Sequence, residues 1–230
     1  MTLSDKELTA IEAELREMYE EQFEIEGINP ESLFWDSEES MRVRFDVALE
    51  MYDFNEASVL DVGCGFGDLY SFLREHGVQP ARYHGIDINS SAIEVAKDRY
   101  DDEEVCTFDE KNILREPYDD EFDIAVGFGT VFNKLNGISN EKYIRAFLQS
   151  CFESADATLI NALSAYRQGD WGYEEGVYYY SPEKVFGYAQ ELTRNVRLRH
   201  DFDPIPQKEF NLLMLPDESD DDIGVVSISD

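Results

Sequence analysis

The stretch VLDVGCGFGD, residues 59–68, decides the fold that this sequence predicts. It opens with an apolar run, interrupted only by Asp61, that is typical of a buried β-strand, and a helical pattern begins at Asp68. The glycines between strand and helix are Gly63, Gly65 and Gly67. Glycine permits a sharp turn and lets a ligand approach the backbone amides at the positive end of a helix. We therefore predict a strand, a ligand-binding turn and a helix.

Outward from this stretch, short apolar runs alternate with helical patterns, which is typical of a parallel sheet built from βα units. The expected strands are residues 58–62, 82–87, 104–108, 122–128 and 157–163, and the expected helices are residues 68–76, 90–100, 140–154 and 182–192. No full helix is expected over residues 109–121. Residues 195–202 and 209–216 have no helical pattern between them, so we expect an antiparallel hairpin at the sheet edge. The fold class is α/β.

The N-terminal segment precedes this alternation and is predicted to be helical. Ser4 and Glu7 are spaced as a capping box at the start of an amphipathic helix over residues 4–24. A second helix, capped by Asp36 or Ser37, follows it. The residues expected on its buried side are Val43, Val47 and Met51.

The length of 230 residues and the 43% hydrophobic content suit one domain with a sizeable core. We expect this domain to span residues 1–215, with the N-terminal helices in residues 1–55. Residues 164–182 are rich in aromatic residues and glycine without periodicity, which predicts a lid-like insertion. Residues 216–230 are rich in acids and predict a flexible tail.

Two acids near the glycines indicate the kind of ligand. Asp61 lies two residues before Gly63, where a carboxylate would repel a pyrophosphate but can orient a cation. Asp87 ends the second strand, 20 residues after Gly67, where an acid can accept hydrogen bonds from both hydroxyls of a ribose. An adenosine with a positively charged, phosphate-free tail fits both acids, and S-adenosylmethionine has this chemistry. NAD is a weaker alternative, because dinucleotide folds use GxGxxG whereas this chain has GxGxG.

Residues 58–132 resemble the core of class I S-adenosylmethionine-dependent methyltransferases. VLDVGCGFGD resembles their first motif, and YHGIDINSSAIEVAK resembles their second strand and helix. The resemblance implies a Rossmann-like three-layer sandwich with a seven-stranded, mostly parallel sheet of order 3-2-1-4-5-7-6, the last strand antiparallel. It also implies S-adenosylmethionine as cofactor, S-adenosylhomocysteine as product, and no metal. The segments FWDSEESMRVRF, LRHDF and EFNLLML resemble a subset with a C-terminal LRHD-type strand, for which the resemblance fixes no substrate.

The resemblance also implies a set of cofactor-binding residues. Asp61 and the glycine backbone would face the methionine part, Asp87 the ribose, and Ile88 the adenine face. Asn112, where family members often have Asp, would lie at the adenine edge, and Phe128 would line the methyl-transfer site. The full set is Asp61, Gly63, Cys64, Gly65, Gly67, Asp87, Ile88, Asn112, Ile113, Phe128, Gly129 and Arg44, the last as a candidate partner of the cofactor carboxylate.

Catalytic and acceptor-binding residues are less clearly marked. His200 lies beside Asp201 near a sheet end, where either could act as a general base or have a structural role. The residues expected on the substrate side are Trp35, Asn133 and Tyr179. The chain has GFGT where amino-methylating nucleic-acid enzymes have [DN]PP[YF], which disfavours base methylation.

Two functions fit these patterns best. The first is methyl transfer to an oxygen or nitrogen atom of a small-molecule or glycan-like acceptor. The second is a non-catalytic S-adenosylmethionine-binding module used for interaction, and an NAD-dependent oxidoreductase is a weaker third.

Composition excludes several other classes. The 51 acidic and 19 basic residues give a net charge of −32, so nucleic acid is a poor partner. No apolar run approaches the length of a membrane span, and the N-terminus does not have the pattern of a signal peptide, so we expect a cytoplasmic protein. Three cysteines without CxxC spacing predict neither a disulfide framework nor a zinc site. The oligomeric state is not indicated.

The charge also generates a prediction about salt. Self-repulsion of 51 acids against 19 bases destabilises the compact state in dilute salt, and about 1 M salt shortens the screening length to roughly 3 Å. We therefore expect a halophilic source, with a merely acidic mesophilic protein as the alternative. The melting temperature should rise between low salt and molar KCl in a thermal melt. Equal or greater stability in low salt would contradict a halophilic source.

Overall fold

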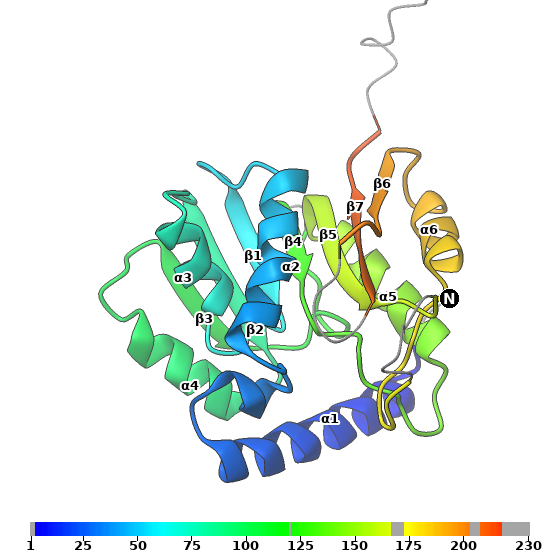
Figure 1. The fold of residues 1–230 in the computed structure, drawn as a ribbon, viewed down its shortest axis with the longest axis horizontal. Helices are drawn as coiled ribbons and strands as arrows, with labels where there is room; N and C mark the ends of the chain where they lie inside the picture. Colours follow the sequence, from blue (N-terminus) through cyan, green and yellow to red (C-terminus); the bar gives the residue numbers. More distant parts are fainter. Residues whose placement is uncertain (1–2, 120, 167–172, 203–207, 218–230) are drawn as a thin grey trace, which may run out of the picture.

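The computed structural model describes residues 3–119, 121–166, 173–202 and 208–217. Its centre is one seven-stranded sheet between two layers of helices (Figure 1). The strands are β1 (Ser58–Val62), β2 (Arg82–Asp87), β3 (Cys106–Glu110), β4 (Phe122–Gly127), β5 (Ala155–Leu163), β6 (Val196–Arg199) and β7 (Glu209–Met214). Their order is β3-β2-β1-β4-β5-β7-β6, and β7 runs antiparallel to both β5 and β6. The predicted Rossmann-like sandwich is confirmed.

The helices cover both faces of the sheet. They are α1 (Asp5–Glu26), the short 3₁₀ helix η1 (Pro30–Leu33), α2 (Glu38–Met51), α3 (Asp68–Glu75), α4 (Ser90–Arg99), α5 (Asn140–Phe152) and α6 (Pro182–Gln190). One apolar cluster joins the sheet to α2, α3 and α4, and a second joins its other face to α1, α5 and α6. Within the described residues, no helix is long and apolar enough to cross a membrane.

The central strand β1 fixes where a ligand can bind. The chain proceeds from β1 outward to β2 and β3, then returns to place β4 on the other side of β1. The connections after β1 and β4 therefore diverge, and a crevice opens at the carboxyl ends of these strands. The pattern SVLDV predicts this strand correctly because both faces are buried, and four of its five residues lie in the buried class.

In its described residues, 111–119 and 121, the connection from β3 to β4 carries no helix, as the sequence predicts. A different element covers this part of the sheet. The apolar residues Leu8, Ile11 and Leu15 of α1 join the same core cluster as Ile113 and Phe147. Helix α1 begins with the predicted capping box, in which the Ser4 hydroxyl accepts from the Glu7 amide and the Glu7 carboxylate accepts from the Ser4 amide.

Two of the expected parallel strands begin at other residues than predicted, and one of them, β5, begins at Ala155 instead of residue 157. The sequence predicts the third strand over residues 104–108, but the strand begins at Cys106, because its register with β2 pairs Tyr83 with Cys106 and Asp87 with Glu110. The capping residue of α2 is Ser37, the second of the two alternatives. Residues 167–172 of the expected aromatic insertion and residues 218–230 of the expected tail lie outside the described residues.

The buried face of α2 also differs from the expected one. Val47 is buried as predicted, but Val43 and Met51 are only half-buried. The face that meets the sheet is shifted around the helix, and its other buried residues are Ser40, Met41, Arg44, Phe45 and Ala48. The reason is that a charged residue, Arg44, points into the core, which hydrophobic spacing alone does not predict.

Arg44 forms a buried ion pair that ties α2 to β7. Its Nε donates to Glu209 Oε2 at 2.7 Å, and a second nitrogen of the guanidinium donates to the other carboxylate oxygen. Its Nη1 donates to the carbonyl oxygen and to the hydroxyl of Ser40 at 2.6 and 3.1 Å. The guanidinium also lies 4.7 Å from the centroid of the Trp35 ring. Because Arg44 is 3% exposed and Glu209 is 0% exposed, neither charge reaches water.

We expect Arg44→Ala to lower the free energy of unfolding by about 3–5 kcal/mol, because it leaves the Glu209 carboxylate buried without a partner. Denaturant unfolding at constant high salt measures this change. Arg194→Ala is the matched control, since it breaks the exposed pair of Arg194 with Asp217 and should cost less than about 1 kcal/mol. Equal losses of unfolding free energy in the two variants would show that burial does not increase the contribution of the Arg44–Glu209 pair.

Candidate active site

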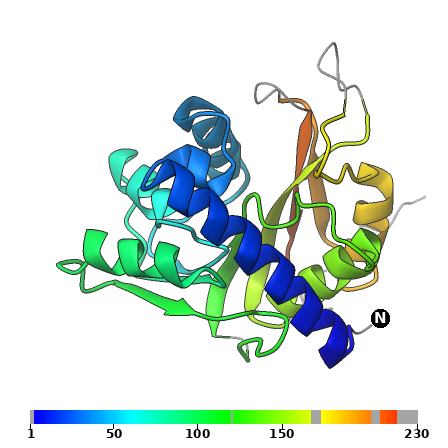
Figure 2. The same ribbon diagram turned by 90° about the horizontal axis from the view of Figure 1, so that it is seen from below.

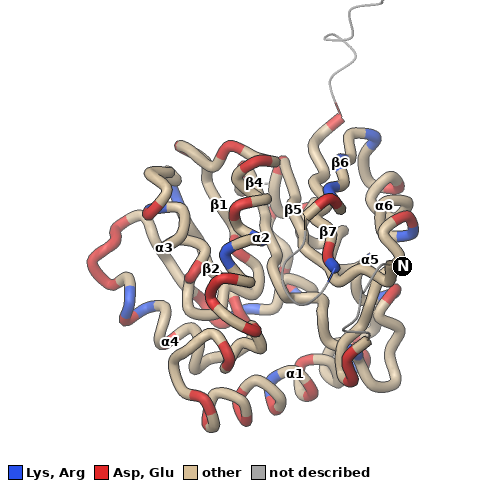
Figure 3. The backbone as a smooth tube through the Cα atoms, in the orientation of Figure 1, with Lys and Arg blue, Asp and Glu red and all other residues tan. Residues whose placement is uncertain are grey.

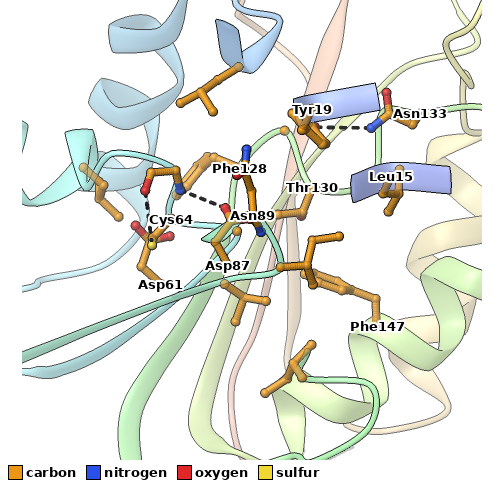
Figure 4. Close-up of a pocket in the computed structure, with 18 of the residues that line it drawn as sticks. Leu15, Tyr19, Asp61, Cys64, Asp87, Asn89, Phe128, Thr130, Asn133 and Phe147 are labelled. Atoms are coloured by element: carbon orange, nitrogen blue, oxygen red, sulfur yellow. Dashed lines mark hydrogen bonds between the residues drawn. The ribbon is translucent and has the colours of Figure 1, made fainter. Parts of the chain in front are cut away.

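A cavity of about 980 Å³, its open mouth included, lies at the carboxyl ends of β1, β2 and β4 (Figure 4). Its floor includes Asp61 of β1, Asp87 of β2 and Phe128, which follows β4. Leu15 and Tyr19 of α1 line the opposite side.

The glycine turn after β1 is built for close packing. Gly63, Gly65 and Gly67 all adopt positive φ angles, of 75°, 53° and 76°. A Cβ atom on Gly63 would lie 2.1 Å from the Thr130 methyl carbon, and one on Gly65 would lie 2.5 Å from a methyl carbon of Leu33. Part of the space that glycine leaves is therefore filled by the protein itself. The turn needs glycine both for its backbone conformation and for these contacts.

Asp87 joins the glycine turn to the end of β2. Its Oδ2 accepts from the Gly65 amide at 3.0 Å, and its Oδ1 accepts from the Asn89 amide at 2.9 Å. Burial raises the pKa of this carboxyl, and the amide hydrogen bonds oppose that rise. Each carboxylate oxygen can accept a second hydrogen bond, and Asp87 is only half-buried, so it can still accept from a ligand in the cavity.

Asp61 is the deeper of the two acids, with 3% of its surface exposed. The Tyr83 hydroxyl donates to its carboxylate. Burial raises the pKa of Asp61 to about 7, and the nearby carboxylates of Asp87 and Asp68 contribute to that rise. A ligand cation beside these acids would favour their ionised forms. The charge of the cavity floor therefore suits a cationic ligand, as the sequence predicts.

Asn112, which we expected to face the edge of the adenine ring, is hydrogen-bonded to other residues of the protein. Asn112 lines the cavity, but its Nδ2 donates to Glu12 of α1 at 2.7 Å and its Oδ1 accepts from the Leu114 amide at 2.9 Å. Both ends of the amide group thus have protein partners. Ile88 and Ile113 line the cavity beside it as apolar walls.

The far wall of the cavity follows β4. Phe128 and Gly129 line it, and Trp35 packs so closely on Gly129 that a Cβ there would lie 2.9 Å from the indole ring. Asn133 lies farther along the same loop, and its Nδ2 donates to the Tyr19 hydroxyl at 3.2 Å (Figure 4). Of the three residues expected on the substrate side, Trp35 and Asn133 line the cavity.

Several expected site residues lie outside the cavity lining. They are Arg44, Gly67, Tyr179, His200 and Asp201. Arg44 is bound by Glu209 instead of facing a cofactor carboxylate. Asp201 accepts from Arg199 Nε at 2.6 Å, which lowers the pKa of Asp201 and makes it a weaker base. The expected catalytic roles of His200 and Asp201 rest on the sequence alone.

Sequence reasoning missed other residues of the cavity, chiefly Leu15 and Tyr19. Their helix is predicted, but no local pattern shows where it docks. Asn89 and Thr130 were also missed. Within the described residues, Asn89 Nδ2 and Thr130 Oγ1 are buried polar atoms without a hydrogen-bond partner, and both residues line the cavity. Such orphaned groups on the cavity lining fit a polar ligand.

Residues 53–163 match the family described as "Methyltransferase domain". This segment is therefore similar to a methyltransferase domain. The matched segment spans β1 to β5 and thus the glycine turn, Asp87 and the loop after β4. The floor of the cavity thus lies within the matched segment, whereas Leu15, Tyr19 and Trp35, which also line the cavity, precede it. Throughout the described residues, no group of three His, Cys, Asp or Glu side chains could hold a metal ion.

Solved structures share the fold of this methyltransferase at low sequence identity. Magnesium protoporphyrin IX methyltransferase (ChlM) from Synechocystis PCC 6803, with bound S-adenosylhomocysteine, has a TM-score of 0.65 and 11% identity over 90% of this chain and 99% of its own. The N-methyltransferase NodS from Bradyrhizobium japonicum WM9 has a TM-score of 0.58 and 17% identity over 80% and 100%. WbdD, co-crystallised with a kinase inhibitor, has a TM-score of 0.55 and 21% identity over 75% of this chain and 40% of its own. No curated protein matches the chain by sequence.

We expect Asp61→Asn to stabilise the ligand-free methyltransferase at alkaline pH. The pKa of Asp61 is about 7 in the folded protein and 3.8 for an unperturbed aspartate, so the native state holds a proton that the unfolded state releases between these values. The free energy of unfolding therefore falls as the pH rises from 3.8 to about 7, and above pH 7 Asp61 causes no further change. The melting temperature of Asp61→Asn minus that of the wild type should grow from pH 5.5 to about 7 and then level off. A difference that is constant over this range would contradict the role of Asp61 burial.

Proposed function

We propose that this enzyme transfers the methyl group of S-adenosylmethionine to an oxygen or nitrogen atom of a small, uncharged or cationic acceptor. The observation that carries the proposal is the arrangement of Asp61, the glycine turn and Asp87 along one floor of a cavity that α1 and Trp35 cover. The floor suits a cationic adenosine ligand. The rest of the cavity, under α1 and Trp35, suits an acceptor small enough to bind beside that ligand.

Four residues of the floor would hold the cofactor. Asp87 has free acceptor capacity for the two ribose hydroxyls, and its carboxylate is oriented by the Gly65 and Asn89 amides. Ile88 and Ile113 provide apolar surface for the adenine ring. Asp61 lies deepest and would face the cationic end of the ligand.

The cofactor, when bound, supplies a methyl group that is already activated on a sulfonium sulfur. The chain must then hold the acceptor atom in line with that methyl group and exclude water. Phe128 and Gly129 would form the wall at this position, and Trp35 packs on Gly129. An amine acceptor attacks in its unprotonated form. For a hydroxyl acceptor, the base proposed from the sequence is His200 or Asp201.

The charges of the cavity disfavour an anionic acceptor. Its acidic lining residues are Asp61, Asp68 and Asp87, and Lys111 is the one cation among the described lining residues. Acids also dominate the outer surface, for example along α1 (Figure 3). A phosphate backbone would meet repulsion on the surface and little compensation inside. A glycan-like acceptor offers uncharged hydroxyls and remains within the proposal, as does a cytoplasmic location.

The likeness to solved methyltransferases supports a small acceptor without identifying it. The name of ChlM gives a porphyrin as its acceptor, and NodS is named as an N-methyltransferase. Both names are compatible with oxygen or nitrogen acceptors.

The first test is calorimetry with S-adenosylhomocysteine in molar KCl. We expect binding by the wild type and a loss of at least about tenfold in affinity in Asp87→Ala, because hydrogen bonds to a charged group are lost. Asp98→Ala is the matched control, since it removes an acid from the exposed side of α4 and should bind like the wild type. Binding of NAD without binding of S-adenosylhomocysteine would overturn the proposal.

The second test supplies S-adenosylmethionine with panels of hydroxyl- and amine-bearing metabolites, oligosaccharides and nucleic acids, and measures release of S-adenosylhomocysteine. We expect release with members of the small-molecule panel, at a rate strongly reduced in Asp87→Ala. Binding of the cofactor without release in any panel would favour a non-catalytic module. Comparable release with nucleic acid would contradict the acceptor class.

A further inference from the structure

Helix α1 crosses the sheet at the edge where the cavity opens, from the region of α5 to the region of α2 (Figure 2). Leu15 and Tyr19, one turn apart on this helix, line the cavity opposite the carboxyl ends of the strands (Figure 4). Removing α1 would therefore open the cavity along one side. No other element of the described chain takes its place, because the connection from β3 to β4 has no helix.

One group of contacts ties α1 to the connection after β3. Arg115 donates from Nε to Glu12 Oε1 and from Nη2 to Glu12 Oε2, both at 2.7 Å, and from Nη1 to Asp5 at 2.6 Å. Asn112 Nδ2 also donates to Glu12, at 2.7 Å. The bidentate pair lowers the pKa of Glu12. Arg115 and Asn112 thus hold two successive turns of the helix.

A second group of contacts ties α1 to α5 and to the loop before it. Lys142 Nζ lies 2.7 Å from both carboxylate oxygens of Glu7. This contact, together with the capping hydrogen bonds from Ser4, lowers the pKa of Glu7 to about 2. Glu14 accepts from the side-chain amide of Asn136 at 2.6 Å. The ionic contacts are therefore distributed along both sides of the helix.

The apolar attachment of α1 is small by comparison. Only Leu8, Ile11 and Leu15 are buried among its 22 residues. Loss of ionic contacts exposes charged groups that water solvates well. Separation of these three side chains, together with the partly buried Met18 and Tyr19 that pack on the same cluster, costs less than unfolding the sheet. The helix can therefore leave the domain as a unit while the seven strands stay paired.

Tyr19 carries a polar group into the covered cavity. Its hydroxyl accepts from Asn133 Nδ2 at 3.2 Å, and within the described residues no acceptor meets the hydroxyl proton. Burial raises the pKa of Tyr19 to about 12, so the hydroxyl stays protonated near neutral pH. It is thus an oriented hydrogen-bond donor held between α1 and the loop after β4.

We propose that α1 is a strap over the cofactor site, that Leu15 and Tyr19 contact the bound cofactor, and that breaking the ionic contacts of Arg115 and Lys142 limits cofactor exchange. The inference rests on the proposed function, because it takes the cavity as the cofactor site. The geometry assigns Tyr19 a binding role and Arg115 and Lys142 a kinetic one.

Dissociation of S-adenosylhomocysteine from the full chain tests the strap. Stopped-flow tryptophan fluorescence can follow it, because Trp35 lines the cavity. We expect Arg115→Gln and Lys142→Gln each to raise the dissociation rate about two- to fivefold, and the double variant about tenfold. Lys184→Gln is the matched control: it also removes one positive charge, but it breaks a pair with Glu141 that does not involve α1, and its rate should equal that of the wild type.

Tyr19→Phe keeps the ring and removes the hydroxyl, so it should weaken the equilibrium affinity for S-adenosylhomocysteine several-fold. The melting temperature of the ligand-free protein should fall only by the loss of the single hydrogen bond from Asn133. Amide hydrogen exchange without ligand gives an independent readout: residues 5–26 should exchange faster in Arg115→Gln than in Lys184→Gln, with unchanged protection of β1 and β4. Intact ligand binding with unaltered dissociation in the Arg115 and Lys142 variants would overturn the strap alone. Absence of ligand binding in the wild type would overturn the proposed function as well.

Discussion

The hydrogen bond from the Gly65 amide to Asp87 is the contact on which the geometry of the site depends. It joins the turn after β1 to the end of β2 at 3.0 Å, next to the point between β1 and β4 where the connections of the sheet diverge. The turn can reach Asp87 only because Gly63 and Gly65 take positive φ angles, and because no side chain on either residue competes with Thr130 and Leu33. A carboxylate fixed by two amides is oriented before any ligand arrives, so little reorganisation is needed for binding.

The parts of the fold that local patterns determine were predictable. SVLDV and RYHGID are buried, β-rich runs, and both strands have the predicted bounds. The buried face of α2 was not, because Arg44 is stabilised by Glu209, 165 residues away, and a charged residue on a buried face contradicts hydrophobic periodicity. The start of β3 was misplaced by two residues, since its bounds follow from pairing with β2 and not from its own composition.

The site residues that belong to local motifs were also predictable from the sequence. Asp61, Asp87 and the glycines belong to a local strand–turn–helix unit whose spacing carries the chemistry, and the structure brings Asp61, Gly63, Gly65 and Asp87 to one cavity. Leu15 and Tyr19 reach that cavity through long-range docking of α1, for which the sequence offers only scattered charges that find partners in space. The chain has 19 basic residues against 51 acidic ones. Two of these basic residues join separate elements: Arg44 joins α2 to β7, and Arg115 joins the connection after β3 to α1.

The position of α1 has a consequence for how the protein is made. Its partners Arg115 and Lys142 lie about a hundred residues or more along the chain, so a growing chain that emerges N-terminus first exposes the helix long before either partner is synthesised. A helix with nine acids among its 22 residues stays solvated and separate during that interval. The sheet can then pair around β1 before the helix docks. Docking of α1 through these ion pairs must therefore follow the synthesis of most of the sheet.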